Sequence, residues 1–184
     1  MTLFTETSDV SVRPAVPGDE RTIGAIQLAA WRIAHAQVLG DSLDLLDAEA
    51  IVTQWATAIT APPAGHRVLV ACAGATVVGF ASTAPVAAPG PAAAPGGVIL
   101  ALEVDPGHQR GGHGSRLLAA AVDLLREDGA DQVLTWVLDG DAARAQFLAG
   151  AGLGPDDTVR ELATGTLPDG STRTVREHRW WASI

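Results

Sequence analysis

Hydrophobic residues follow two different spacings along this chain. In several short stretches they alternate with polar residues or form a brief apolar run, which is the pattern of β-strands with one or both faces in a core. The predicted strands are residues 10–15, 68–73, 76–83, 98–104, 132–138, 158–167 and 171–182. Short turns at Gly74-Ala75 and Pro168-Asp169-Gly170 predict that four of these strands form two hairpins.

Four other stretches repeat their apolar residues every three or four positions, as amphipathic helices do. The first, third and fourth begin near Asp19, Ser115 and Asp141, and the second lies somewhere between Ser42 and Ile59. Ile33 belongs to the apolar stripe of the first. Between the third and fourth strands, residues 85–97 hold four prolines and three glycines, which predicts a polyproline-like loop.

Strands and helices mix along the chain without an internal repeat or a shift in composition. We therefore expect one α/β (α+β) domain over residues 1–184, with a mixed, mostly antiparallel sheet of about six or seven strands flanked by about four helices. Residues 1–9 are polar without a period and are expected to form a disordered tail.

Charge and composition narrow the possible partners. The net charge is −9, and no lysine occurs, which argues against a nucleic-acid partner. An acidic surface favours a cationic substrate, with solubility alone as the alternative explanation. Cys72 is the single cysteine, so no disulfide, cysteine cluster or metal site is expected. No run approaches the roughly 20 apolar residues of a membrane span and no signal segment is visible, so we expect a cytoplasmic protein with no membrane partner.

The most informative stretch joins the strand at 98–104 to the helix after it. It reads Gln109-Arg110-Gly111-Gly112-His113-Gly114-Ser115. A glycine-dense loop that opens a helix exposes unpaired N–H groups at the positive end of the helix dipole, which favours a phosphate ester as ligand. A Walker loop would need a lysine after its glycines, and a dinucleotide fingerprint would need glycine at Leu117, so both are excluded.

What remains is the pattern Q-x-x-G-x-G, which resembles the pyrophosphate loop of the GNAT superfamily of acyl-CoA-dependent N-acyltransferases. Upstream, Leu102, Val104 and Pro106 match the family's L-x-V-x-P, and downstream, residues 141–153 resemble its N-x-x-A-x-x-F-Y-x-x-x-G-F segment. The resemblance covers residues 98–155 firmly and the rest loosely. It implies the GNAT fold, in which the strands at 98–104 and 132–138 splay apart around the pantetheine of acetyl-CoA (CoA).

The resemblance also implies which residues bind this cofactor, largely through main-chain groups. Asp141 stands where the family usually has asparagine, so it could orient the pantetheine arm, with a helix N-cap as the alternative role. The implied cofactor-binding residues are Val104, Gln109, Arg110, Gly111, Gly112, His113, Gly114, Ser115 and Asp141.

The implied activity is transfer of an acetyl group from acetyl-CoA to a primary amine of a small molecule or peptide, by direct attack in a ternary complex. Glu103 is the carboxylate nearest the acetyl position by sequence and is the predicted catalytic base, with His35, His178 and Glu177 in reserve. Trp31 and His35 are candidate substrate-binding residues. The alternatives are a core position for Trp31 and a solvated one for His35. The resemblance also implies a homodimer joined through the C-terminal strands, as is usual in the family.

One departure from the family bears directly on catalysis. Leu148 stands where the family usually has the tyrosine that protonates the departing thiolate, and the chain contains no tyrosine. A thiol with a pKa near 8.5 can leave as the thiolate, so losing the acid would slow transfer by perhaps 10²- to 10⁴-fold without abolishing it. The alternatives are a catalytically weak acyl-CoA-binding regulatory module of the same fold and an unrelated phosphate-binding α/β protein.

Overall fold

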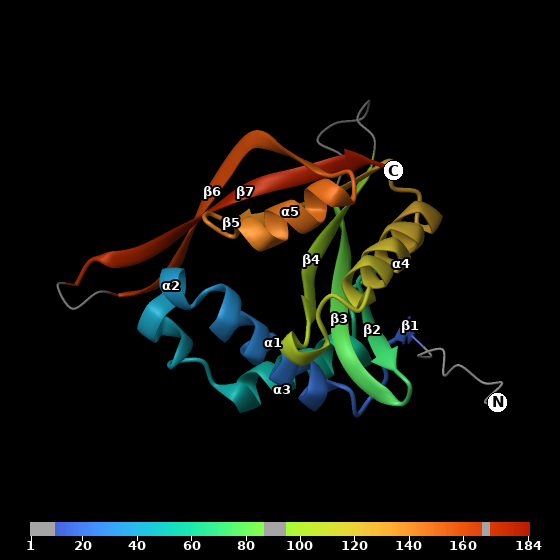
Figure 1. Ribbon diagram of the computed structural model, residues 1–184, viewed down its shortest axis with the longest axis horizontal. Coiled ribbons are helices and arrows are strands. Elements are labelled where there is room, and N and C mark those ends of the chain that lie inside the picture. Colours follow the sequence, from blue (N-terminus) through green and yellow to red (C-terminus); the bar gives the residue numbers. More distant parts are fainter. Residues whose placement is uncertain (1–9, 87–94, 167–169) are drawn as a thin grey trace, which may run out of the picture.

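The computed structural model describes residues 10–86, 95–166 and 170–184, and seven strands in these ranges form one sheet in the order β1-β2-β3-β4-β5-β7-β6 (Figure 1). The strands are β1 (Val10–Pro14), β2 (Arg67–Ala73), β3 (Thr76–Val86), β4 (Gly96–Val104), β5 (Gln132–Leu138), β6 (Gly154–Thr166) and β7 (Thr172–Ser183). Every neighbouring pair is antiparallel except β4 with β5. The predicted mixed, mostly antiparallel sheet is confirmed.

Four longer helices and several short helical segments accompany the sheet. They are α1 (Glu20–Ala34), α2 (Ala36–Leu39), α3 (Ala48–Thr60), α4 (His113–Glu127), α5 (Ala142–Gly150), and the 3-10 segments η1 (Gly40–Leu43) and η2 (Pro106–His108). The second predicted helix, expected between Ser42 and Ile59, begins at Ala48, because the Asp47 carboxylate caps it by accepting hydrogen bonds from the amides of Glu49 (2.9 Å) and Ala50 (3.2 Å). Among the described helices, none is long and apolar enough to span a membrane.

Strand β2 shows how the sheet divides the core into two layers. Leu69 and Ala71 pack into the cluster beneath α4 and α5, whereas Val68, Val70 and Cys72 pack into the cluster beneath α1 and α3. Side chains alternate between the faces of a strand, so a strand covered on both faces is apolar throughout. This explains the continuous apolar run in β2.

The last turn of α1 leaves the core. Ile23 and Ile26 are buried, but Ile33, which we expected in the same apolar stripe, is 71% exposed. Trp31 and Ala34, its neighbours in this turn, line cavities described below. The last turn of α1 therefore faces the cavities and solvent, and helical periodicity alone did not reveal where burial of the apolar stripe ends.

The predicted loop at residues 85–97 is shorter than expected. Pro85 pairs with Gly97 and Val86 with Gly96, so both ends of the predicted loop belong to the β3–β4 ladder. A Cβ at Gly97 would overlap the side chain of Leu125, and glycine here lets α4 pack closely on β4. The rest of the predicted loop, the predicted disordered tail and part of the predicted turn lie outside the described residues, at 87–94, 1–9 and 167–169.

Strands β4 and β5 part halfway along β4. Their ladder runs from the pair Gly96 and Gln132 to the pair Ile99 and Thr135, and the Thr135 hydroxyl donates to the Ile99 carbonyl at 2.9 Å where it ends. A bulge in the β3–β4 ladder follows at once and leaves Leu100 outside the register. Among the described residues, the edge of β4 beyond this point therefore has no strand partner on the β5 side, and the predicted splay is confirmed.

Candidate active site

Two cavities meet where β4 and β5 part. The first cavity, of about 450 Å³, lies between β4, the loop before α4, and α5. The second cavity, of about 320 Å³, lies between β4 and β5, the end of α1 with α2 and η1, and the β6–β7 pair. Three described residues line both cavities, and we name Glu103, Asp141 and Arg144 the junction residues.

The loop at one end of the first cavity has the backbone geometry of an anion site. Gly112 is the N-cap of α4 in the left-handed region, with φ of 81°. Its carbonyl accepts the first helical bond from the amide of Arg116 at 3.1 Å, so the amides of the three residues between them have no acceptor in the helix. Among the described residues, Arg110 is the one non-glycine residue with positive φ, at 63°. This strained turn presents helix N–H groups toward a ligand.

Most of the predicted cofactor-binding residues gather around this cavity. Those that line it are Val104, Gln109, Arg110, Gly112, Gly114, Ser115 and Asp141. Gln109 Nε2 also donates to the Val104 carbonyl at 3.3 Å, which ties the loop to the end of β4. Gly111 and His113 do not line the cavity, and the His113 side chain is instead buried at 6% exposure.

The loop carries net positive charge. Burial, helped by the charges of His108 and Arg116, lowers the pKa of His113, so this ring is neutral at pH 7. A hydrogen bond from His108 Nδ1 at 3.0 Å lowers the pKa of Asp105, whose carboxylate also accepts from the Gly107 amide. The exposed guanidinium of Arg110 remains at the cavity wall, where it favours an anion.

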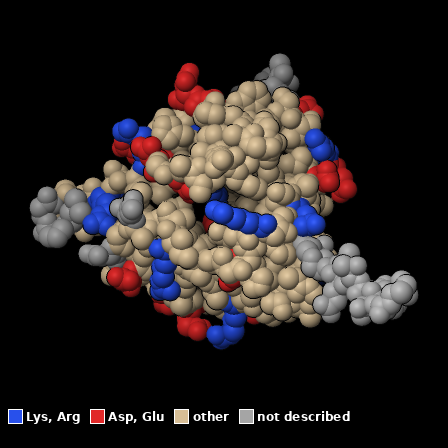
Figure 2. Space-filling model, in the orientation of Figure 1, with Lys and Arg blue, Asp and Glu red and all other residues tan. Residues whose placement is uncertain are grey.

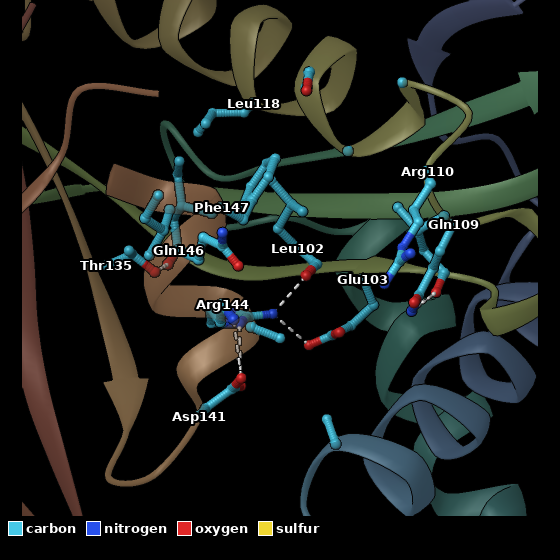
Figure 3. A pocket seen from close by; sticks show the side chains of 18 residues that line it. Leu102, Glu103, Gln109, Arg110, Leu118, Thr135, Asp141, Arg144, Gln146 and Phe147 are labelled. Atoms are coloured by element: carbon cyan, nitrogen blue, oxygen red, sulfur yellow. Dashed lines mark hydrogen bonds and ion pairs between the residues drawn. The ribbon is translucent and has the colours of Figure 1, made fainter. Parts of the chain in front are cut away.

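The junction residues form a compact charged cluster (Figure 3). Arg144 Nη2 donates to the Leu102 carbonyl at 2.6 Å and to Glu103 Oε1 at 2.8 Å, and its Nε lies 3.9 Å from Asp141 Oδ2. The side chains of Arg144, Glu103 and Asp141 are only 20%, 14% and 8% exposed. Asp141 Oδ1 also accepts from the Arg144 amide at 2.9 Å, which confirms its predicted role as the N-cap of α5. The cluster joins α5 to β4 across the split in the sheet.

Sequence reasoning missed Arg144. In the family pattern N-x-x-A-x-x-F-Y the fourth position is alanine, and with Asp141 at the first position the fourth is Arg144. This departure was visible in the sequence, but only the fold brings Arg144 against Glu103, a residue 41 positions away. Leu148, which stands at the tyrosine position, is 4% exposed and lines the first cavity.

The second cavity is mainly apolar. Its lining includes Trp31, Leu39, Leu43, Leu46, Leu100, Trp136, Leu138, Leu162 and Val175. Trp31 and His35 both line this cavity, so the structure brings the predicted substrate-binding pair together, and Trp31 belongs to neither core cluster. Buried Nδ1 of His35 has no hydrogen-bond partner among the described residues.

The reserve bases are placed differently. Glu177 lines the second cavity, where its carboxylate forms an ion pair with Arg160 at 2.6 Å, and the Arg160 guanidinium lies 4.1 Å from the ring centre of Trp136. His178 lines neither cavity and lies 3.7 Å from Asp139. Within the described chain, no group of three histidine, cysteine or acidic side chains could hold a metal ion.

The space-filling view shows the same region from outside. In the orientation of Figure 1, the middle of this face is hollowed between the part that carries α5 and the part that carries α1 and α3, and arginine atoms lie across the hollow (Figure 2). The other acidic and basic side chains on this face lie mostly near the outline of the molecule. Positive charge therefore marks the entrance of an otherwise acidic protein of net charge −9.

Comparison with known proteins agrees with this geometry. Residues 30–153 match the model of the acetyltransferase (GNAT) family. The comparison with curated protein sequences gives no match.

Solved structures of similar fold extend over nearly the whole chain. The PaiA N-acetyltransferase from Thermoplasma acidophilum, in complex with coenzyme A, has a TM-score of 0.72 at 16% identity, with 96% of this chain and 99% of that chain covered. The ribosomal-protein-alanine N-acetyltransferase from Brucella melitensis has a TM-score of 0.67 at 21% identity, with 95% and 99% covered. The yncA protein from Salmonella typhimurium, a putative acetyltransferase with acetyl-CoA, has a TM-score of 0.62 at 17% identity, with 95% and 93% covered.

Proposed function

This chain belongs to the acetyltransferase (GNAT) family, and we propose that it transfers an acetyl group from acetyl-CoA to a primary amine by direct attack in a ternary complex. The observation that carries the proposal is the meeting of two cavities at one charged junction. One cavity ends in an anion-binding loop, and the other is apolar with acidic groups at the junction. Two substrates can therefore be bound from opposite sides with their reacting groups facing each other.

Acetyl-CoA is assigned to the first cavity. The amides at the start of α4 and the Arg110 guanidinium would hold its diphosphate, and the free edge of β4 near Val104 would pair with its pantetheine. Structural neighbours in complex with coenzyme A or with acetyl-CoA support this assignment. The thioester end would then lie near the junction residues, because the first cavity reaches from the loop to Asp141 and Arg144.

The amine is assigned to the second cavity. The junction holds two carboxylates and one guanidinium that pairs with both, so its net charge is −1 and an ammonium group would balance it. The leucine and tryptophan lining favours a substrate that carries this amine on an apolar or aromatic body, either in a small molecule or in a peptide side chain or N-terminus.

Glu103 is proposed as the base that removes the amine's proton. An amine with a pKa near 10.4 is neutral in only about one molecule in a few thousand at pH 7, so attack needs a proton acceptor close by. Glu103 lines both cavities. Arg144 holds one oxygen, Oε1, and among the described residues Oε2 has no hydrogen-bond partner, which leaves it available to the amine.

Thiol release from acetyl-CoA in the presence of a panel of amines tests this function. We expect release that depends on the amine, fastest with arylalkyl and other apolar amines, and slower with small polar ones. Calorimetry with CoA serves as the companion measurement. CoA binding without amine-dependent release would support the weak acyl-CoA-binding module, and undetectable CoA binding would contradict the assignment of the first cavity.

We also propose a homodimer joined through β6 and β7. β6 is an edge strand of the sheet, and Trp181 on the neighbouring β7 is 41% exposed, so this edge offers apolar surface and unpaired backbone groups to a second copy. Light scattering at several protein concentrations tests this assembly, and a monomer mass throughout would rule it out. Trp181→Ser is expected to shift a dimer toward the monomer.

A further inference from the structure

The chain lacks the group that would protonate the departing thiolate, since it has no tyrosine and Leu148 stands at the family's tyrosine position. We propose that Arg144 replaces that tyrosine by stabilising the charge of the thiolate. The proposal rests on the acetyl transfer proposed above and concerns the same site. It assigns a catalytic role to a residue at which this chain departs from the family pattern.

The position of Arg144 supports this role. Residues four apart in a helix lie on the same face one turn apart, so Arg144 and Leu148 project toward the same side of α5. Both line the first cavity, but Arg144 lines the second cavity as well. Its guanidinium therefore lies where a thioester bound from one side and an amine bound from the other would meet (Figure 3).

The hydrogen bonds of Arg144 leave donors available. Nη2 uses its two N–H groups on the Leu102 carbonyl and Glu103 Oε1, while Nη1 has no hydrogen-bond partner in the part of the chain that the structure describes. The bonds that Nη2 makes fix the orientation of the planar guanidinium before any substrate binds. A donor held in place in a partly buried site is the arrangement that stabilises charge developing in a reaction.

The charged groups around Arg144 come from several elements. Glu103 belongs to β4, Asp141 caps α5, and the second cavity adds His35 from the end of α1 and Glu177 from β7. Glu177 is paired with Arg160, and the ammonium of the amine substrate would balance the remaining carboxylate. Within this set, Arg144 is the only fixed cation among the described residues that line both cavities.

The chemical step balances with these groups. The neutral amine nitrogen forms a bond to the carbonyl carbon, the bond from that carbon to sulfur breaks, and the electron pair stays on sulfur. The proton lost by the amine passes to Glu103 and then to solvent. Arg144 keeps its own proton, because a guanidinium does not deprotonate in proteins, and it stabilises the thiolate by charge and hydrogen bonding until water protonates the sulfur.

The first test measures the thiol itself and needs no amine. CoA with an isotope label at the carbon that bears sulfur reports the pKa of its bound thiol by NMR. Because a cation beside a thiol favours the thiolate, we expect this pKa to be higher in Arg144→Gln than in the wild-type complex by about one pH unit or more. Arg126→Gln is the matched control, since Arg126 also pairs with an aspartate three residues earlier, at 3.2 Å, but is 52% exposed on α4. It should leave the thiol pKa unchanged.

The second test varies the leaving group. Arg144→Gln should lower kcat with acetyl-CoA by about 10²- to 10³-fold, and by much less with the selenoester analogue, whose more acidic selenolate needs little stabilisation. The comparison is made within one protein preparation, so a loss of folded protein would cancel. Adding Leu148→Tyr to Arg144→Gln should recover at least about tenfold of the lost rate with the thioester, because a tyrosine at that position can act as the acid.

The outcomes separate this proposal from the proposed function. An unchanged thiol pKa in the Arg144→Gln complex, or equal losses with thioester and selenoester, would show that Arg144 only ties α5 to β4. If instead wild-type protein binds no CoA, or releases thiol without any dependence on amine, the proposed function itself is wrong.

Discussion

The two cavities are built in different ways. The loop end of the first cavity comes from one continuous stretch, residues 102–118, and its main recognition groups are backbone amides at the start of α4. The second cavity is lined by side chains from α1, α2, η1, β4, β5, α5, β6 and β7, which span residues 31–177. One site is local in sequence and made of main chain, and the other is dispersed and made of side chains.

This difference explains which site a sequence pattern can reveal. Backbone recognition requires particular φ angles and close approach, and these demand glycine at fixed positions, so the loop leaves a motif. Side-chain recognition leaves no fixed spacing, because any residue on a suitably placed element can contribute. The junction residues include one of each kind. The position of Glu103 could be inferred from the strand pattern, whereas the role of Arg144 becomes visible only through the contact between α5 and β4.

The largest effect is expected from Glu103→Gln, which removes the base but keeps an oxygen for Arg144. We expect kcat to fall by about 10²- to 10⁴-fold, with a smaller change in the KM for acetyl-CoA. Steady-state kinetics with the best amine of the panel measures it. Glu161→Gln is the matched control, because Glu161 also pairs with an arginine, at 3.3 Å, but is 59% exposed on β6. A normal kcat in Glu103→Gln would move the role of base to His35 or Glu177.

The next largest effect is expected at the loop. A Cβ at Gly112 would meet Arg116 Nη1 at 2.7 Å, and φ of 81° is unfavourable for a β-branched residue. Gly112→Val should therefore weaken CoA binding by about 100-fold, as measured by calorimetry. Gly129→Val is the control, since Gly129 has φ of 88° and open space around it, so it carries the same backbone strain away from the cavity. If both variants bind CoA like the wild type, the loop does not hold the diphosphate.

A smaller and more selective effect is expected in the second cavity. Trp136→Ala removes an aromatic wall and the ring beneath the Arg160 guanidinium, so we expect the KM for an apolar amine to rise by about tenfold. The KM for acetyl-CoA should stay within about twofold, because Trp136 does not line the first cavity. Trp181→Ala, on the neighbouring strand and 41% exposed, should change neither constant. Equal changes in both constants would mean that the cavities are not separate binding sites.

The smallest effect concerns a region remote from both cavities. Arg13 donates to Asp19 at 2.7 and 3.0 Å, and these bonds lower the pKa of Asp19 below its ordinary value. A carboxylate with a lowered folded-state pKa stabilises the fold above its unfolded pKa, and this contribution is lost as pH falls through the folded pKa. Asp19→Asn should thus reduce the free energy of unfolding by about 1 kcal/mol at pH 7, and the difference should shrink below about pH 4.

Denaturant unfolding at several pH values measures this difference. Asp123→Asn, which breaks the exposed pair with Arg126, is the control and should change stability by less than about 0.5 kcal/mol. Acetyl transfer should be unaffected by Asp19→Asn at pH 7. A stability difference that grows at acidic pH would contradict the assigned sign.

Much of the fold could be predicted because its signals are local. The strands at 98–104 and 132–138 and the N-cap at Asp141 depend on short-range patterns, and all are present in the structure. The exposure of Ile33 and the strand pairing of Gly97 could not be predicted in this way, because both depend on where another element ends or packs.

The sequence by itself determined the glycine loop, since backbone conformation depends on residues close to one another in the chain, and its resemblance to the family implied the parted strands. Only the tertiary structure decided that Arg144 meets Glu103 and Leu102, and that Trp31, Trp136 and Glu177 share one cavity. The physical reason is that charges and apolar surfaces act over a few ångströms of space, whatever their separation in the chain.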